Sequence, residues 1–223
     1  MFSAADKIAI ADAITAAEAH TSGEIVAIVS DRVDHYPATG LTYAALLAFA
    51  LPLAATLLGV GPDRIGALTD WSSGDAGEDL RRAVEAYAAV QIVVFVLAAA
   101  LFVRTRLGAA LTPRPIKREH VHAAALTQFR ARGIGATRAH TGVLIYVSLH
   151  DRIAEVVADT AIFAKVSPGH WATAVIALTD GIKAGTPGAG FVNAIALAGA
   201  VLAEHFPATG DNVDELPNRL IEL

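Results

Sequence analysis

The stretch GVLIYVSLHDRIAEVVAD, residues 142–159, decides the fold expected for this chain. Residues 142–149 form an apolar run of strand length that is rich in β-branched side chains, and residues 152–159 again have strand character. His150 and Asp151 lie between the two runs and suit a tight turn. The stretch therefore predicts a β-hairpin.

A further strand is predicted far upstream, at residues 24–30 (EIVAIVS). Its side chains are apolar on both faces, which is typical of a strand buried within an α/β sheet. The residues before it predict a helix that begins after Ser3, has Asp6 in its first turn and ends near His20. Because one strand is not stable alone, residues 24–30 need the hairpin as their neighbour in the sheet.

Helices are also predicted after the hairpin, at about residues 168–185 and 188–206. In the second of these, the apolar run at residues 194–203 is too short to cross a membrane and indicates a helix packed in the core. The acidic tail, residues 211–223, is expected on the surface.

Two uncharged stretches interrupt this pattern, at residues 41–60 and 86–103, with a mixed-charge loop predicted at residues 61–83. Twenty helical residues span about 30 Å, which matches the hydrocarbon thickness of a bilayer. The alternative is a buried core helix for each stretch, but two such runs flanked by charges favour a membrane. The mean hydropathy of +0.50 agrees with that interpretation.

The fold class predicted from these elements is α/β, with a small mixed sheet flanked by helices and interrupted by a two-helix transmembrane hairpin. Residues 1–40 and 104–223 are the two parts of the α/β domain, and residues 41–103 are the hairpin. Two crossings return the chain to the same side of the membrane, which permits the two parts to share a sheet.

Composition excludes several classes of function. The formal net charge is −5, so no basic surface is expected and nucleic acid is not an expected partner. The chain has no cysteine, which excludes thiol nucleophiles and cysteine-ligated metal sites.

Four stretches outside the hairpin resemble the TPM domain family: residues 18–26 (EAHTSGEIV), 141–148 (TGVLIYVS), 151–152 (DR) and 156–159 (VVAD). The order of elements is similar to that domain over nearly all of the chain outside the hairpin. The resemblance implies an α/β sandwich, and relatives with a similar layout are bacterial membrane proteins. It also implies either phosphatase activity with calcium binding or an accessory role in membrane complexes.

The distribution of basic residues predicts the orientation in a bacterial inner membrane. Six lysines and arginines near the span ends lie on the domain side and three lie in the connecting loop. By the positive-inside rule, the protein is expected to be a multi-pass protein whose domain is cytoplasmic.

Candidate site residues lie at the strand ends. Glu24 and Asp159 could hold calcium or another divalent cation; the alternative is that both are exposed end-of-strand acids or helix-capping groups. Asp151 and Arg152 could bind a phosphate, because arginine presents a planar fork to anionic oxygens, or form a turn with a surface ion pair. Thr141 completes this set of candidate ligand-binding residues.

A weaker candidate is formed by Glu119, His120 and His122. The two histidines are two residues apart, which on a helix places them on different faces rather than at one metal site. They are therefore expected to be separate surface residues.

The function expected from these observations is that of an integral membrane accessory protein, whose domain binds a membrane partner or a small ligand. The alternative is a membrane-anchored, metal-dependent phosphatase. A third possibility is that the helices oligomerise, because Ala44 and Ala48 offer small residues four positions apart. Neither span contains an ionisable residue, which gives a transport path little support.

Overall fold

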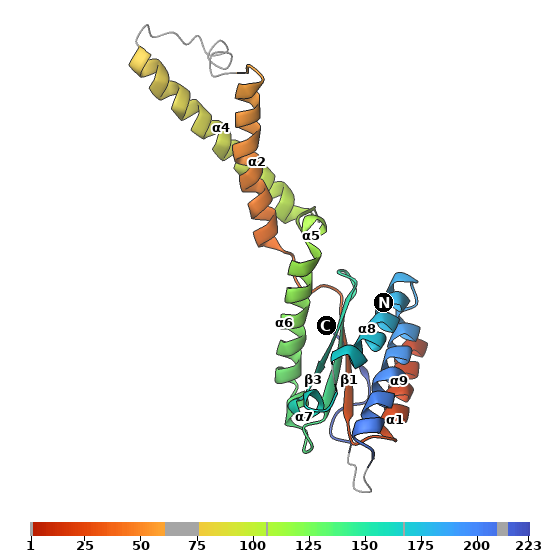
Figure 1. The fold of residues 1–223 in the computed structure, drawn as a ribbon. Coiled ribbons are helices and arrows are strands. Elements are labelled where there is room, and N and C mark those ends of the chain that lie inside the picture. The colour runs from red at the N-terminus through yellow and green to blue at the C-terminus, as the bar shows by residue number, and fades with distance from the viewer. Residues whose placement is uncertain (1, 61–75, 106, 167, 209–213) are drawn as a thin grey trace. The chain divides into compact units, whose positions relative to one another are not determined.

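The computed structural model describes residues 2–60, 76–105, 107–166, 168–208 and 214–223. The chain forms two compact units (Figure 1). One, here called the α/β unit, combines Met1–Asp34 with Arg114–Leu223, and the other, the helical unit, is His35–Pro113. The α/β unit is therefore assembled from two segments that are far apart in the sequence.

The α/β unit contains helices that precede and follow its strands. Its first segment contributes helix α1 and strand β1, and its second segment contributes the remaining elements. In chain order they are α1 (Ala4–Glu18), β1 (Glu24–Ser30), α6 (Arg114–Ala131), the 3₁₀ turn η1 (Ile134–Ala136), β2 (Gly142–Ser148), β3 (Ile153–Ala158), α7 (Thr160–Phe163), α8 (Pro168–Lys183), α9 (Pro187–His205) and β4 (Leu220–Glu222).

The described residues contain four strands, which form one mixed sheet in the order β3-β2-β1-β4. β1 pairs in parallel with β2 along its whole length, so that Glu24 lies opposite Gly142 and Ser30 opposite Ser148. β2 and β3 pair as an antiparallel hairpin. The predicted pairing of residues 24–30 with the hairpin is therefore confirmed, and with it the small mixed sheet flanked by helices.

Helices cover both faces of the sheet (Figure 1). α6 packs on one face, where Val121 and Ala125 join Ile28 and Leu144 in a buried cluster. α1, α8 and α9 lie on the other face, and their buried side chains form a second cluster with the alternate residues of β1 and β2. Every residue of β1 and β2 is buried, so both strands are covered on both faces, as their mainly apolar sequences predict.

The start of β2 requires a glycine. A Cβ atom on Gly142 would overlap the carbonyl oxygen of Ile134 in the preceding 3₁₀ turn. This close approach of two backbone segments fixes the loop at residues 133–142 against the sheet, and that loop carries part of the candidate site described below.

The C-terminal tail differs from the prediction. Residues 220–222 form β4, which pairs in parallel with β1, and Leu220 is buried. The prediction of a surface tail was therefore wrong for Leu220, whereas Glu222 is exposed as predicted. A three-residue strand is too short to show a hydrophobic period. As a result β4 brings the acidic residues just before it close to the start of β1.

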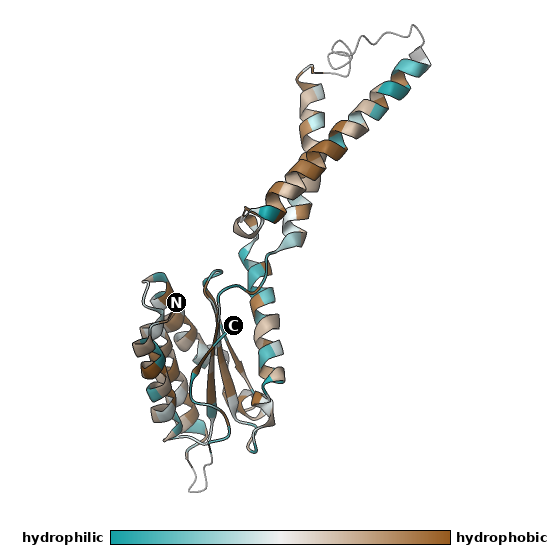
Figure 2. Cartoon of the chain, turned by 180° about the vertical axis from the view of Figure 1, so that it is seen from behind, coloured by the Kyte–Doolittle hydropathy of each residue, from teal (hydrophilic) through white to brown (hydrophobic). Residues whose placement is uncertain are grey.

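The helical unit contains α2 (Pro37–Leu57), α4 (Ala76–Arg104) and the short α5 (Leu107–Leu111). Most of the large apolar side chains of α2 and α4 are exposed, among them Phe49, Leu53 and Leu97. Figure 2 shows the hydrophobic colour along the middle of α4. Exposed apolar surface of this extent on two neighbouring helices is typical of a membrane or protein interface.

In the part of the chain that the structure describes, three helices are long and apolar enough to cross a membrane: α2, α4 from Gly77, and α9. The criterion is the length and the composition of each helix alone. α9 differs from the other two because its buried face, which includes Phe191, Ile195 and Leu202, belongs to the core of the α/β unit.

α4 begins ten residues before the predicted second span, and residues 76–83 of the predicted loop are helical. The first turns of the helix carry charges that pair along one face: Arg82 contacts Glu78 at 2.5 Å and Arg81 contacts Glu85 at 2.8 Å. Such pairs four residues apart stabilise a helix in water. The rest of the predicted loop, residues 61–75, lies outside the described residues.

Candidate functional site

The predicted site residues lie at two opposite ends of the sheet. Glu24 opens β1, Thr141 precedes β2, and Asp159 follows β3, which runs in the opposite direction. These three residues therefore share one end. Asp151 and Arg152 lie in the turn between β2 and β3, at the other end.

Three acidic residues meet at the first end of the sheet, and we call them the acidic cluster: Glu18, Glu24 and Asp214. Glu18 is the last residue of α1, Glu24 is the first residue of β1, and Asp214 lies six residues before β4. One carboxylate oxygen of each lies within 4.8 Å of those of the other two. Glu18 and Glu24 are buried, whereas Asp214 is exposed.

Backbone N–H groups hold the two buried carboxylates in place. The N–H of Ile25 donates to Oε1 of Glu18 at 2.8 Å, and the N–H of Leu216 donates to Oε2 of Glu24 at 3.3 Å. The first bond joins the end of α1 to the start of β1, and the second joins β1 to a segment 192 residues later in the sequence. The cluster is thus positioned by the end of α1, the start of β1 and the segment before β4.

Burial changes the protonation of this cluster. It raises the pKa of Glu18 to about 8, and the nearby charges of Glu24 and Asp214 act in the same direction. Burial also raises the pKa of Glu24, and Asp214 adds to the effect. Glu18 is therefore mainly protonated at neutral pH in the absence of a cation.

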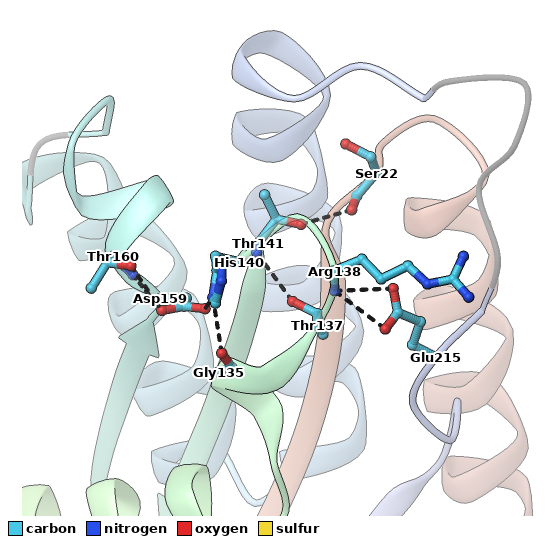
Figure 3. A network of polar contacts seen from close by, with 9 residues as sticks. All are labelled: Ser22, Gly135, Thr137, Arg138, His140, Thr141, Asp159, Thr160 and Glu215. Carbon is cyan, nitrogen blue, oxygen red and sulfur yellow. Dashed lines mark hydrogen bonds and ion pairs between the residues drawn. The ribbon is translucent and has the colours of Figure 1, made fainter.

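The loop before β2 contacts the residues just before β1 and the segment before β4 (Figure 3). The hydroxyl of Thr141 donates to the carbonyl oxygen of Ser22 at 2.8 Å. The carbonyl oxygen of Thr141 accepts from the N–H of Glu24 at 3.1 Å. The N–H of Arg138 donates to both carboxylate oxygens of Glu215 at 3.3 Å. Thr141 thus joins the loop to the start of β1.

Asp159 faces a different set of partners, also drawn in Figure 3. Its Oδ1 accepts from the N–H of Thr160 at 2.6 Å, which caps α7, and its Oδ2 lies 3.3 Å from Nδ1 of His140. His140 has a left-handed backbone, with φ at 53°, and its ring is exposed. Nδ1 of His140 also lies 3.1 Å from the carbonyl oxygen of Gly135, so this ring nitrogen has two oxygen neighbours.

Glu24 and Asp159 lie on either side of β2, with Gly142 opposite both. Strands are spaced by about 4.8 Å, so the two backbones are about 10 Å apart. The carboxylates that approach Glu24 belong instead to Glu18 and Asp214. We therefore place the candidate cation site at the acidic cluster.

At the other end of the sheet, Asp151 is buried and paired with a residue other than Arg152. Its Oδ2 accepts from the hydroxyl of Ser148 at 2.9 Å, and its Oδ1 lies 3.6 Å from Nζ of Lys117. Arg152 is exposed and has a left-handed backbone, with φ at 54°, as the turn requires. The turn is confirmed, and the ion pair joins it to α6.

The two neighbouring histidines of α6 have separate partners. Nδ1 of His120 lies 2.8 Å from Oδ2 of Asp34, and Nδ1 of His122 lies 3.7 Å from Oε2 of Glu155. They point to different neighbours, as their spacing predicts.

Sequence reasoning missed Glu18 and Asp214 as site residues. Glu18 lies within the stretch that carries the family resemblance, but its position at the end of a helix looked like an ordinary solvated residue. Asp214 lies in the acidic tail, and no local pattern predicts that β4 brings this tail to the start of β1. One feature of the sequence could have identified Glu18: it and Glu24 stand on either side of the turn between the first helix and the first strand.

The acidic cluster offers oxygen ligands, which hard divalent cations such as Ca²⁺ and Mg²⁺ prefer. Binding would require Glu18 to lose its proton, so a cation and protons would compete for the same carboxylates.

Comparison with known proteins shows the fold. No family model and no curated protein matches the sequence. A solved structure is similar: the NMR structure of the BA42 protein from the psychrophilic bacterium Bizionia argentinensis, at 22% sequence identity. The alignment covers 100% of this chain and 96% of that one, with a TM-score of 0.57. This chain therefore shares the fold of a bacterial protein of known structure.

Proposed function

We propose that this protein is an integral membrane accessory protein: α2 and α4 cross a bacterial inner membrane as a hairpin, and the α/β unit binds a membrane partner or a small ligand. The observation that carries the proposal is the pairing of β1 with β2 in one sheet. Two apolar helices separate these strands in the sequence, so an even number of crossings is required.

The cytoplasmic side is the proposed location of the α/β unit. Of the lysines and arginines near the spans, six belong to the segments next to the domain and three to the segment between the spans. The resemblance of residues 18–26, 141–148, 151–152 and 156–159 to the TPM domain family supports an accessory role, because accessory factors of membrane complexes occur in that family.

Photo-cross-linking in native membranes tests this function. A photoreactive amino acid at exposed Arg138 or Arg152 should capture the same membrane protein in repeated preparations, whereas the same group at exposed Asp12 on α1 serves as the control. Capture of that protein equally from all three positions, or of none from the first two, would contradict a specific partner at either end of the sheet.

The second candidate function is a membrane-anchored, metal-dependent phosphatase, and the acidic cluster is the observation that favours it. A cation held by Glu18, Glu24 and Asp214 could polarise a phosphoryl oxygen or activate a water molecule. Calcium or another divalent cation is the proposed cofactor of this alternative.

The raised pKa of Glu18 predicts a pH dependence that tests the cation site. A carboxyl whose folded pKa is about 8 and whose ordinary value is 4.5 stabilises the fold fully below pH 4.5. This contribution is lost as pH rises through 8, so the cation-free protein should melt at a lower temperature at pH 8.5 than at pH 6. Glu18→Gln should remove most of this difference.

Calcium, magnesium and manganese at millimolar concentration should raise the melting temperature of the full chain in detergent at pH 8.5, and less at pH 6. Asp214→Asn should weaken the shift, while Glu204→Gln, an exposed acid outside the cluster, should leave it unchanged. Hydrolysis of p-nitrophenyl phosphate is measured in parallel. An equal melting temperature with and without each cation at pH 8.5 would remove the basis of the phosphatase alternative.

A further inference from the structure

One edge of the sheet is open. β3 is the last strand of the order β3-β2-β1-β4, and its pairing partner is β2. No backbone hydrogen bond joins β3 to any described residue outside β2. The other edge is occupied by β4, a short strand contributed by the C-terminal tail. The open edge is therefore a place where another strand can add to this sheet.

The pairing register identifies the backbone groups that face outward. The N–H of Asp159 donates to the carbonyl oxygen of Gly142, so this opposite pair is one that exchanges hydrogen bonds. In an antiparallel ladder such pairs alternate with pairs that do not. The N–H and C=O groups of Ala154 and Val156 therefore point away from β2, toward the open edge.

A groove of about 950 Å³ runs beside the first half of β3, between α6 and α8. Ile153 and Ala154 of β3 contribute to its floor, and Val175 and Ile176 form an apolar wall on α8. Ile176 is 59% exposed, although it is apolar. The groove thus combines open strand backbone with uncovered apolar side chains.

The rim of the groove carries more positive than negative charge. Four of its residues are cationic and three are anionic: Arg114, Arg118, Arg152 and Lys183 against Glu119, Glu155 and Asp180. Glu155 lies 3.9 Å from Arg118, and Asp180 lies 3.1 Å from Lys183. Arg114 and Arg152 make no ion pair with any described residue. Two arginines are thus available to an acidic ligand.

We propose that this groove binds an extended acidic peptide segment of a partner protein, which adds to β3 as a fifth strand. Side chains of an added strand alternate between the two faces of the sheet. They would meet the cationic residues of α6 on one face and the apolar wall of α8 on the other. The groove therefore fits a peptide in which acidic and apolar residues alternate.

The proposed groove rests on the accessory function for the presence of a partner. It adds the chemistry of the partner segment that is bound.

The binding is measured on the full chain in a neutral detergent by fluorescence anisotropy. The probe is a labelled, end-blocked hexapeptide that alternates glutamate and valine. Two control peptides alternate lysine and valine, or place all glutamates before all valines.

The alternating acidic peptide should bind at least tenfold more tightly than either control. Arg114→Glu and Arg152→Glu should each weaken binding fivefold or more, because each reverses a rim charge. Arg130→Glu is the matched control: it changes the same charge on exposed surface of α6 but lies outside the groove, and it should change binding less than twofold.

Ala154→Pro tests the backbone contact, because proline at this position removes an outward N–H and leaves the bonds to β2 intact. It should abolish binding. In the unaltered chain, amide hydrogen exchange gives an independent readout: the peptide should slow exchange at Ala154 and Val156.

Equal binding of the three peptides, or unchanged exchange at β3, would overturn the proposal. Two other results would also overturn it: variant-sensitive binding to phosphatidylglycerol vesicles without peptide binding, which assigns the groove to lipid, and a dimer that Ala154→Pro dissociates, which assigns the edge to a second copy. The accessory function would survive each of these failures if cross-linking still captured a membrane partner.

Discussion

A chain in which residues 35–113 are replaced by a short glycine-serine linker is expected to be soluble without detergent and to retain the sheet. The α/β unit contains all four strands and both buried clusters. The replaced segment contains α2 and α4, which carry most of the exposed large apolar side chains. Their removal takes away the apolar surface that we propose contacts lipid.

The contact between Asp34 and His120 sets the length of the linker. Their side-chain atoms lie 2.8 Å apart, so the end of the first segment lies close to the middle of α6. Arg114 is six residues before His120, about 9 Å along a helix. A linker of about eight residues, which reaches roughly 26 Å when extended, spans this distance with slack.

Size-exclusion chromatography and the dispersion of amide NMR signals measure the outcome. The shortened chain should elute as a discrete species with dispersed signals. Leu144→Asp in the same shortened chain is the control, because it places a carboxylate in the buried cluster beneath α6 and should abolish the dispersion. An aggregated or disordered shortened chain would show that the two segments do not form a unit by themselves.

The strands of this fold could be predicted because they are long and strongly patterned. Residues 24–30 and 142–148 are apolar throughout, and the turn at residues 149–152 lies where His150 and Asp151 suggest it. Their pairing followed from the instability of a lone strand. The capping box of α1, in which Ser3 and Asp6 bond reciprocally, was visible as a serine followed three residues later by an acid.

The acidic cluster could not be predicted in full, because its members meet through tertiary structure. Glu24 was identified from its place at a strand end. Ligands of α/β sheets bind at the carboxyl ends of strands, whereas Glu24 is at the amino end of β1. Asp214 joins the cluster because the three residues of β4 pair with β1. A strand that short leaves no period in the sequence.

The open edge of β3 likewise depends on strand order, which a sequence constrains weakly. Residues 153–158 pattern as a strand, but whether a strand is central or at the edge depends on how many neighbours the chain supplies. The turn residue Arg152 was singled out for its charge, and the structure places that charge on the rim of a groove.

Thiol labelling in intact cells shows whether the chain crosses the membrane twice, with β1 and β2 on one side. The chain has no cysteine, so a single introduced cysteine is the sole thiol target. Three positions are informative: Asp12→Cys before the spans, Ser73→Cys between them and Glu204→Cys after them. Asp12 and Glu204 are exposed on the α/β unit.

A maleimide that does not cross membranes is applied to spheroplasts before and after lysis. We expect labelling of the cysteine at position 73 in intact spheroplasts, and labelling at positions 12 and 204 after lysis alone. Labelling of position 12 and position 204 from opposite sides would mean an odd number of crossings, and labelling of all three from one side would mean none. Either result would contradict a membrane hairpin inserted into one sheet.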